Sequence, residues 1–267
     1  KASSGTGGFV LLSAGNTTAT AKSGGAVLIR SGFSKLATSG KVQILTSDSS
    51  TTAGSGSMYM ETGNATVSGG LGTTSGSIFV RSGDAEDDTG SIAVQAGTSL
   101  SENGGSVSLL GGNTVGEGGL AGDIVLSAGA GHHPDDTSGG QGGDVSITGG
   151  ETFGTHTTAN LGGEVAITGG QAHGSSGGDI LLTSGFGIAS SSGRIDIKTD
   201  NAGTSGTSGK LLLKTGDATQ AFDAGDIELN AGEGAPNGTG DGGDITLTAG
   251  TSTQTGGSIM LSAGRSS

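Results

Sequence analysis

The strongest constraint on this chain is a short motif that recurs along nearly its whole length. The motif reads small residue, Gly, x, h, x, h, x, s, Gly, in which h is aliphatic or Met and s is small. Counted by its opening glycine, it occurs sixteen times with a mean spacing of about 17 residues, a scale typical of repeat architectures. The opening glycines are Gly8, Gly25, Gly40, Gly56, Gly76, Gly90, Gly105, Gly122, Gly143, Gly163, Gly178, Gly193, Gly209, Gly225, Gly243 and Gly257.

The two h positions are apolar in every repeat, and their spacing points both side chains to one face of an extended strand. The first h residues are Val10, Val27, Val42, Met58, Ile78, Ile92, Val107, Ile124, Val145, Val165, Ile180, Ile195, Leu211, Ile227, Ile245 and Ile259. The second h residues are Leu12, Ile29, Ile44, Met60, Val80, Val94, Leu109, Leu126, Ile147, Ile167, Leu182, Ile197, Leu213, Leu229, Leu247 and Leu261. We therefore expect one short strand per repeat.

The end of each repeat is built from small residues. The s position, from Ala14 to Ala263, is always Ala, Ser, Thr or Gly, and the closing position is Gly in all repeats except those that end at Ser47 and Asp200. Glycine permits a positive φ or a close approach of two backbones. This placement predicts that the chain turns after the closing glycine towards the next repeat.

The predicted fold is all-β: a parallel β-solenoid of about sixteen repeat strands, forming a single domain over residues 1–267. Sixty glycines and no Trp leave only a thin, repetitive core of stacked aliphatic residues. The outward residue between the two h positions is more polar in every third repeat, which favours three strands per coil. The alternatives are a flattened coil of two strands and an antiparallel meander.

Charge and composition exclude several partners. Eleven basic and twenty-four acidic side chains give a net charge of −13, which opposes binding to nucleic acid or to an anionic membrane surface. The apolar runs are too short to span a bilayer, and the absence of cysteine rules out disulfides.

The sequence offers no pairing of nucleophile and base, so we expect no enzyme, no cofactor and no dedicated metal site. The weak candidates for metal binding are Asp84, Asp87 and Asp88, whose oxygens could hold Ca²⁺ loosely, and His132 with His133. Adjacent histidines do not share a face, so a solvated loop is the simpler interpretation there. The candidate glycosylation sites are Asn16, Asn64 and Asn237, each in an Asn-x-Thr triplet between repeats.

Runs such as GGDITLTAG and GGSIMLSAG resemble the Gly-rich β-solenoid regions of secreted surface proteins, fibrous adhesins and microbial or algal extracellular filaments. The resemblance implies an extracellular or cell-surface location and a structural role. We expect a subunit of a fibre or surface appendage whose partners are copies of itself, with glycans as a further partner. The repeat runs from Gly8 to Gly264, so we expect uncapped ends at which copies add head to tail.

Two other functions are compatible with the sequence. Outward threonines such as Thr148, Thr168 and Thr246 suggest an adhesin stalk or an ice- or glycan-binding face, although Lys198 and Lys214 interrupt the threonine rows. A β-helix enzyme that degrades polysaccharides is the weaker alternative, because its groove would need aromatic platforms and clustered acid and base groups.

Overall fold

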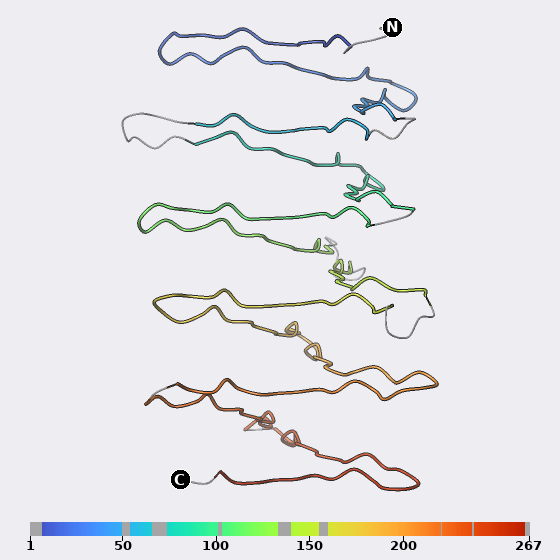
Figure 1. The fold of residues 1–267 in the computed structure, drawn as a ribbon, viewed down its shortest axis with the longest axis vertical. Coiled ribbons are helices and arrows are strands. Elements are labelled where there is room, and N and C mark those ends of the chain that lie inside the picture. The colour runs from blue at the N-terminus through green and yellow to red at the C-terminus, as the bar shows by residue number, and fades with distance from the viewer. Residues whose placement is uncertain are drawn as a thin grey trace. The chain divides into compact units, whose positions relative to one another are not determined.

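The computed structural model describes residues 7–49, 54–65, 74–100, 103–132, 140–154, 160–219, 221–236 and 238–264. Across these ranges the backbone forms neither a helix nor a strand, so there are no element bounds to give. The chain runs instead as extended segments joined by loops (Figure 1).

The expected all-β solenoid is therefore wrong. The backbone hydrogen bonds of the described residues join positions at most 14 apart, as between Gly143 and Gly129. In a solenoid of either coil size, backbone bonds would instead run continuously between neighbouring coils. The repeats have the alternation of a strand but lack the hydrogen-bonded neighbour that would make them strands.

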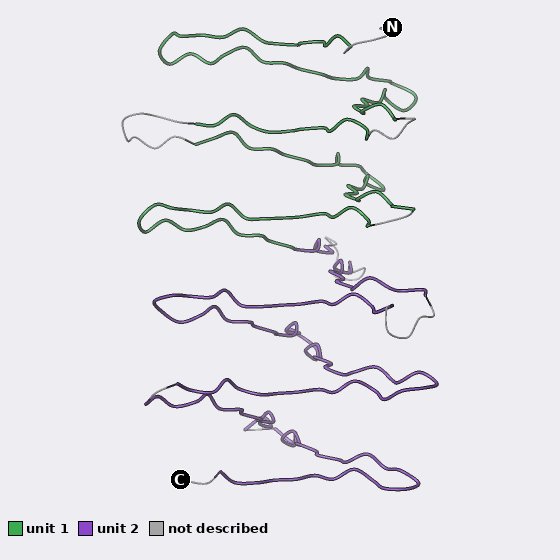
Figure 2. Ribbon diagram, in the orientation of Figure 1, with its two compact units in different colours: residues 1–126 green, residues 127–267 purple. Residues whose placement is uncertain are grey.

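The chain divides into two compact units, Lys1–Leu126 and Ser127–Ser267 (Figure 2). The boundary falls inside the eighth repeat, Gly122–Gly129, and follows no change in the motif. Both units are built from the same kind of repeat.

Within each unit the chain winds in wide turns, with the loops projecting outwards. In the C-terminal unit the loops 170–178 and 216–225 project to one side of Figure 1, and the loops 200–209 and 250–257 project to the other. The two loops of each pair lie three repeats apart in the sequence. Each repeat thus carries the chain from the base of one loop to the base of the next.

The structure has no buried core among the described residues. Ile147 and Ile167, which the solenoid would have enclosed, are 66% and 65% exposed. The predicted burial of the thirty-two side chains at the h positions is therefore wrong. As with the strands, no neighbouring coil of the described residues is stacked closely enough to cover them.

Candidate assembly surface

The ordered contacts of the chain lie at the junctions where one repeat ends and the next begins. At nine of the fifteen junctions the opening glycine donates its backbone N–H to the carbonyl oxygen of the closing glycine before it, at 2.8–2.9 Å. These bonds close loops at their base. The pairs are Gly25 with Gly15, Gly40 with Gly32, Gly122 with Gly112, Gly143 with Gly129, Gly163 with Gly150, Gly178 with Gly170, Gly193 with Gly185, Gly243 with Gly232, and Gly257 with Gly250.

The two glycines of a junction are not equivalent. A Cβ placed on the opening residue Gly163 would lie 2.7 Å from the backbone N of Gly150, a distance that no real side chain tolerates. A Cβ placed on the closing residue Gly150 would meet nothing within 4 Å. Close approach therefore demands glycine at position 163, whereas position 150 has open space. At the other opening glycines that follow a junction the nearest atom to an added Cβ would lie at 3.0–3.9 Å, so the crowding there is milder.

The expected positive φ of the closing glycines is not found. Among the described glycines only Gly118 and Gly206 have a positive φ, at 69° and 136°, and both lie inside loops rather than at junctions. The second use considered from the sequence, close backbone approach, is found at opening glycines such as Gly163 and not at the closing glycines, where an added Cβ would meet nothing within 4 Å.

The residue at the s position packs against the next opening glycine, which explains why it is always small. In the seventh, ninth and tenth repeats it is itself glycine. A Cβ on Gly111, Gly149 or Gly169 would collide with the carbonyl oxygen of the opening glycine that follows. At most other junctions an alanine, serine or threonine touches the same place, as Ala96 does at Gly105.

Threonine at the s position changes the junction. None of the four junctions with Thr46, Thr62, Thr199 or Thr215 has the backbone bond between the closing and the opening residue, although both of these residues are described; the closing residue is Ser47 after Thr46 and Asp200 after Thr199. Instead, the Thr62 hydroxyl donates to the carbonyl oxygen of Gly76 at 3.1 Å, and the Thr199 hydroxyl to that of Gly209 at 3.3 Å. At these two junctions the threonine hydroxyl, rather than a backbone N–H, is the donor in the bond with the opening glycine. Nothing in the structure explains why the bond is also absent after Ser82 and Ala96.

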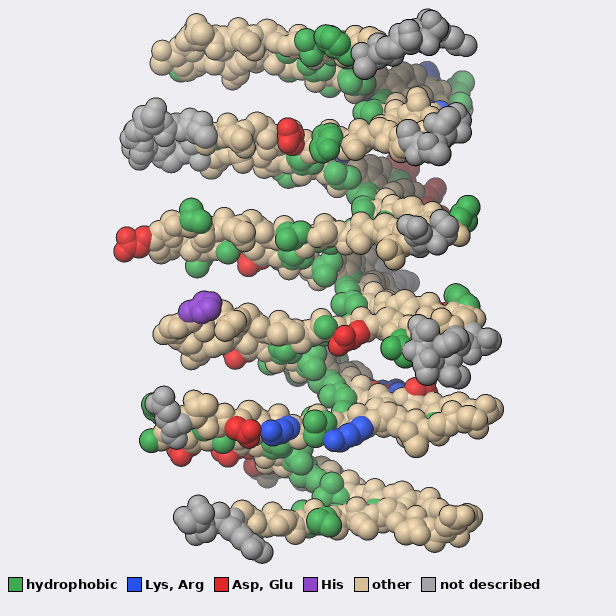
Figure 3. Space-filling view, in the orientation of Figure 1, with side chains coloured by type: hydrophobic (Ala, Val, Ile, Leu, Met, Phe, Trp, Pro, Cys, Tyr) green, Lys and Arg blue, Asp and Glu red, His purple; other side chains and the backbone are tan. Residues whose placement is uncertain are grey.

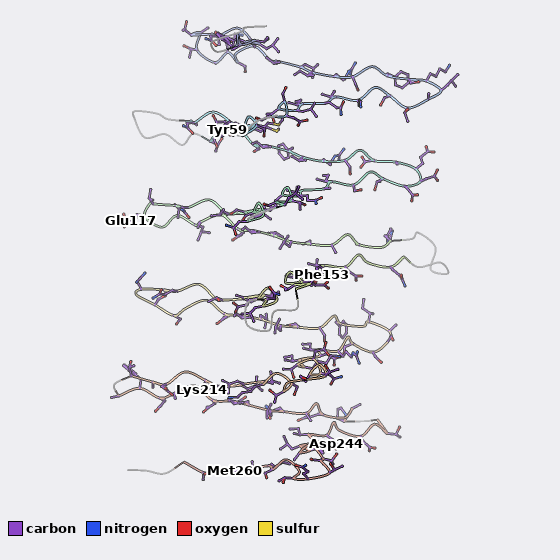
Figure 4. The ribbon with its side chains drawn as sticks, turned by 45° about the vertical axis from the view of Figure 1, so that its right-hand side comes forward. Tyr59, Glu117, Phe153, Lys214, Asp244 and Met260 are labelled. Carbon is purple, nitrogen blue, oxygen red and sulfur yellow. The ribbon has the colours of Figure 1, made fainter. Side chains whose placement is uncertain are left out.

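The aliphatic side chains form two rows, named here by their place in the repeat. The first row consists of the residues at the first h position, which are 48–57% exposed in every repeat except that of Val10. The second row consists of the residues at the second h position, which are 59–75% exposed except at Leu261. Large apolar residues at the outward position between them are 64–90% exposed. Figure 4 shows two such outward residues, Tyr59 and Met260.

The first row is more covered than the large apolar residues at the outward positions in every repeat except that of Val10, which agrees with the predicted facing of the first h residue. The second row overlaps the outward positions in exposure, so the predicted facing of the second h residue stays a prediction. Figure 3 shows hydrophobic side chains on the repeats, towards the middle of the view, while the projecting loops are mostly uncharged polar residues and backbone. The aliphatic rows are thus a surface that recurs in both units.

The predicted metal candidates do not form a site in the part of the chain that is described. No group of three or more His, Asp or Glu side chains there could hold a metal ion. Asp84 lies 3.6 Å from Arg81, a contact between two well-exposed side chains, and is not gathered with Asp87 and Asp88. His132 is exposed, and His133 lies outside the described residues.

Two of the three candidate glycosylation sites lie in described loops. Asn16 and Asn64 are exposed, each one residue beyond a closing glycine. Asn237 lies outside the described residues. Glu117 of the loop 112–122 lies at the outer edge of Figure 4, which illustrates how far a loop carries its side chains from the repeats.

Comparison with models of protein families, with curated proteins and with solved structures finds no match to this chain. No helix in the described ranges is long and apolar enough to cross a bilayer. The aliphatic rows and the glycine junctions are therefore the features from which a function has to be argued.

Proposed function

We propose that this protein is a structural subunit of an extracellular fibre or surface appendage, in which copies of the chain cover one another's aliphatic rows. The observation that carries the proposal is the exposure of both rows in every repeat, at 48% or more of each residue. Exposed apolar patches far smaller than this mark interaction surfaces in soluble proteins.

The total exposed area supports association. The chain exposes 26,878 Å². A compact monomer of this mass exposes about 10,000 Å² and the fully unfolded chain about 36,000 Å². The single chain is thus closer to the unfolded limit. Because folding is stabilised mainly by removing apolar surface from water, most of the stabilisation has to come from contacts with other molecules.

Repetition suits such contacts to a long assembly. A pair of aliphatic side chains recurs in all sixteen repeats. Once a partner is bound at one repeat, its contact with the next repeat is made at a high effective concentration. A contact that does not close on itself continues into a filament. The extracellular location rests on the resemblance of the Gly-rich runs to secreted surface proteins.

Head-to-tail addition at the chain ends, the route of assembly expected from the sequence, is not part of this proposal. Addition at the uncapped ends of a solenoid requires a solenoid, and the described residues contain no strand. Contacts along the repeats take its place in the proposal.

Electron microscopy of the purified chain, with sedimentation velocity across a range of concentrations, tests the proposal. We expect fibres or large assemblies above a threshold concentration and loss of them on dilution. A monodisperse monomer at high concentration, with a compact sedimentation coefficient, would contradict it, because it would mean that the chain covers its own rows.

A further inference from the structure

We infer that the partner of the aliphatic rows is a second copy of this chain whose repeats lie alongside the first, so that repeats rather than loops form the contact. This inference rests on the proposed function and specifies the interface within it. Three observations carry it. The backbone of each repeat has unused hydrogen-bonding groups, the residues of the first row are about half exposed throughout, and the chain as a whole leaves a large area exposed.

Between its two glycines, the backbone of a described repeat makes no backbone–backbone hydrogen bond. In the repeat Gly163–Gly170, the N–H of Gly163 and the carbonyl oxygen of Gly170 are used at the two junctions. None of the backbone bonds of the described residues involves Val165, Ala166 or Ile167 between them. An extended segment with free donors and acceptors along it is a template for another extended segment. The same chain supplies such segments in equal number.

The first row is covered to nearly the same degree in each repeat. Exposure stays within 48–57% in fifteen consecutive repeats, from Val27 to Ile259. Each of these residues therefore keeps about half of its surface open, to nearly the same degree from repeat to repeat. Exposed apolar surface that recurs at a regular spacing fits a partner with the same repeat, because the partner's aliphatic pairs can contact the first-row residues one after another.

The exposed area determines the size of the partner. An ordinary protein–protein interface buries about 1,600 Å² in total. The excess exposure of this chain over a compact monomer is about 17,000 Å², roughly ten times as much. A partner docked at one patch would leave most repeats uncovered. A second copy lying along the repeats is long enough and has the matching pattern.

The loops lack these properties. The bonded junctions close loops whose two glycines are between 7 and 14 positions apart, so the loops differ in length from one repeat to the next. Their large apolar residues, such as Phe33, Phe153 and Ile188, are well exposed but occur at positions that differ from loop to loop. Side chains such as Glu117 project away from the repeats (Figure 4). They offer no surface that recurs sixteen times.

Thiol protection in single-cysteine variants tests the inference, because the chain has no cysteine of its own. Val145→Cys places a thiol in the first row, and Val165→Cys is a second variant at an equivalent position. Glu117→Cys is the control in a loop. Each purified variant is reacted with a thiol reagent below and above the concentration at which sedimentation shows assembly, and again in denaturant.

We expect the thiols at 145 and 165 to react freely in the monomer and to lose about tenfold or more of their reactivity in the assembly. The thiol at 117 should react equally in both. Assemblies in which the thiols at 145 and 165 stay as reactive as that at 117 would overturn the inference and leave the proposed fibre intact. Protection in the monomer would overturn it too, since the chain would then cover its own row. A chain that stays monomeric at all concentrations would overturn the fibre proposal itself.

Discussion

At the scale of single residues, the two glycines of the junction between Gly150 and Gly163 differ in what they tolerate. We expect Gly163→Ala to break the junction, because its Cβ would press against the backbone of Gly150. Gly150→Ala should be harmless, since its Cβ enters open space and its φ is not positive. The expected cost at 163 is about 1–3 kcal/mol, whereas alanine at 150 should stabilise by up to about 1 kcal/mol by restricting the unfolded chain.

Hydrogen exchange at the amide of residue 163, which donates to the Gly150 carbonyl at 2.8 Å, measures this difference. Exchange should become about tenfold faster or more in Gly163→Ala and should be unchanged or slower in Gly150→Ala. Equal effects of the two substitutions would show that the asymmetry between opening and closing positions is not real.

Part of the junction could be predicted from the sequence, namely the regular placement of glycine and the small size of the residue at the s position. Their contact could not be predicted, because the residue that Ala96 or Gly149 touches belongs to the next repeat, across a loop of variable length. The constant smallness of s was the available signal for that contact.

At the scale of one repeat, the predicted strand is wrong, and the predicted facing finds support only at the first h residue, which is more covered than the outward positions. The h-x-h spacing is a local property, and backbone geometry alone converts it into a face. A strand also needs a hydrogen-bonded neighbour, and no local pattern specifies which segment, or which molecule, supplies it. The sequence was therefore informative about the orientation of Val145 and Val165 and silent about what covers them.

A charge-matched pair of variants in one repeat tests the role of that face. Val165→Asp puts a carboxylate into the first row, whereas Ala166→Asp adds the same charge at the neighbouring outward position. We expect Val165→Asp to raise the concentration needed for assembly at least tenfold, because a charge would have to be desolvated without a partner. Ala166→Asp should have a much smaller effect.

Sedimentation velocity over a dilution series measures both thresholds. Because both variants carry the same net charge, any difference between them comes from the face and not from general repulsion. Equal thresholds would show that the first row does not take part in assembly. Circular dichroism of the dilute monomers provides the control that neither variant alters the isolated chain.

At the scale of the whole molecule, assembly has to overcome the charge of the chain. Each copy carries a net charge of −13, so copies placed side by side repel one another. Acidic residues directly after an opening glycine, such as Asp144, Glu164 and Asp179, put part of this charge on the repeats themselves. The exposed ion pair between Arg194 and Asp196, at 3.1 Å, relieves little of it.

Salt should therefore promote assembly. The screening length falls from about 30 Å at 0.01 M to about 8 Å at 0.15 M ionic strength, which shortens the range of repulsion between neighbouring copies. We expect the assembly threshold to fall as sodium chloride is added, and to fall further in the variant Asp144→Asn, measured by sedimentation at fixed pH. A threshold that rises with salt would mean that attraction between opposite charges, not the aliphatic rows, holds the copies together.

Calcium at matched ionic strength separates screening from specific binding. The carboxylates of Asp84, Asp87 and Asp88 are not gathered into a site within the described chain, so calcium and sodium should lower the threshold similarly once ionic strength is equal. A much larger effect of calcium, abolished by Asp87→Asn with Asp88→Asn, would instead mean that association creates a site from carboxylates of two copies. Because a carboxylate-rich loop alone holds Ca²⁺ weakly, such a result would place that loop at a contact between copies and contradict an interface made by the repeats alone.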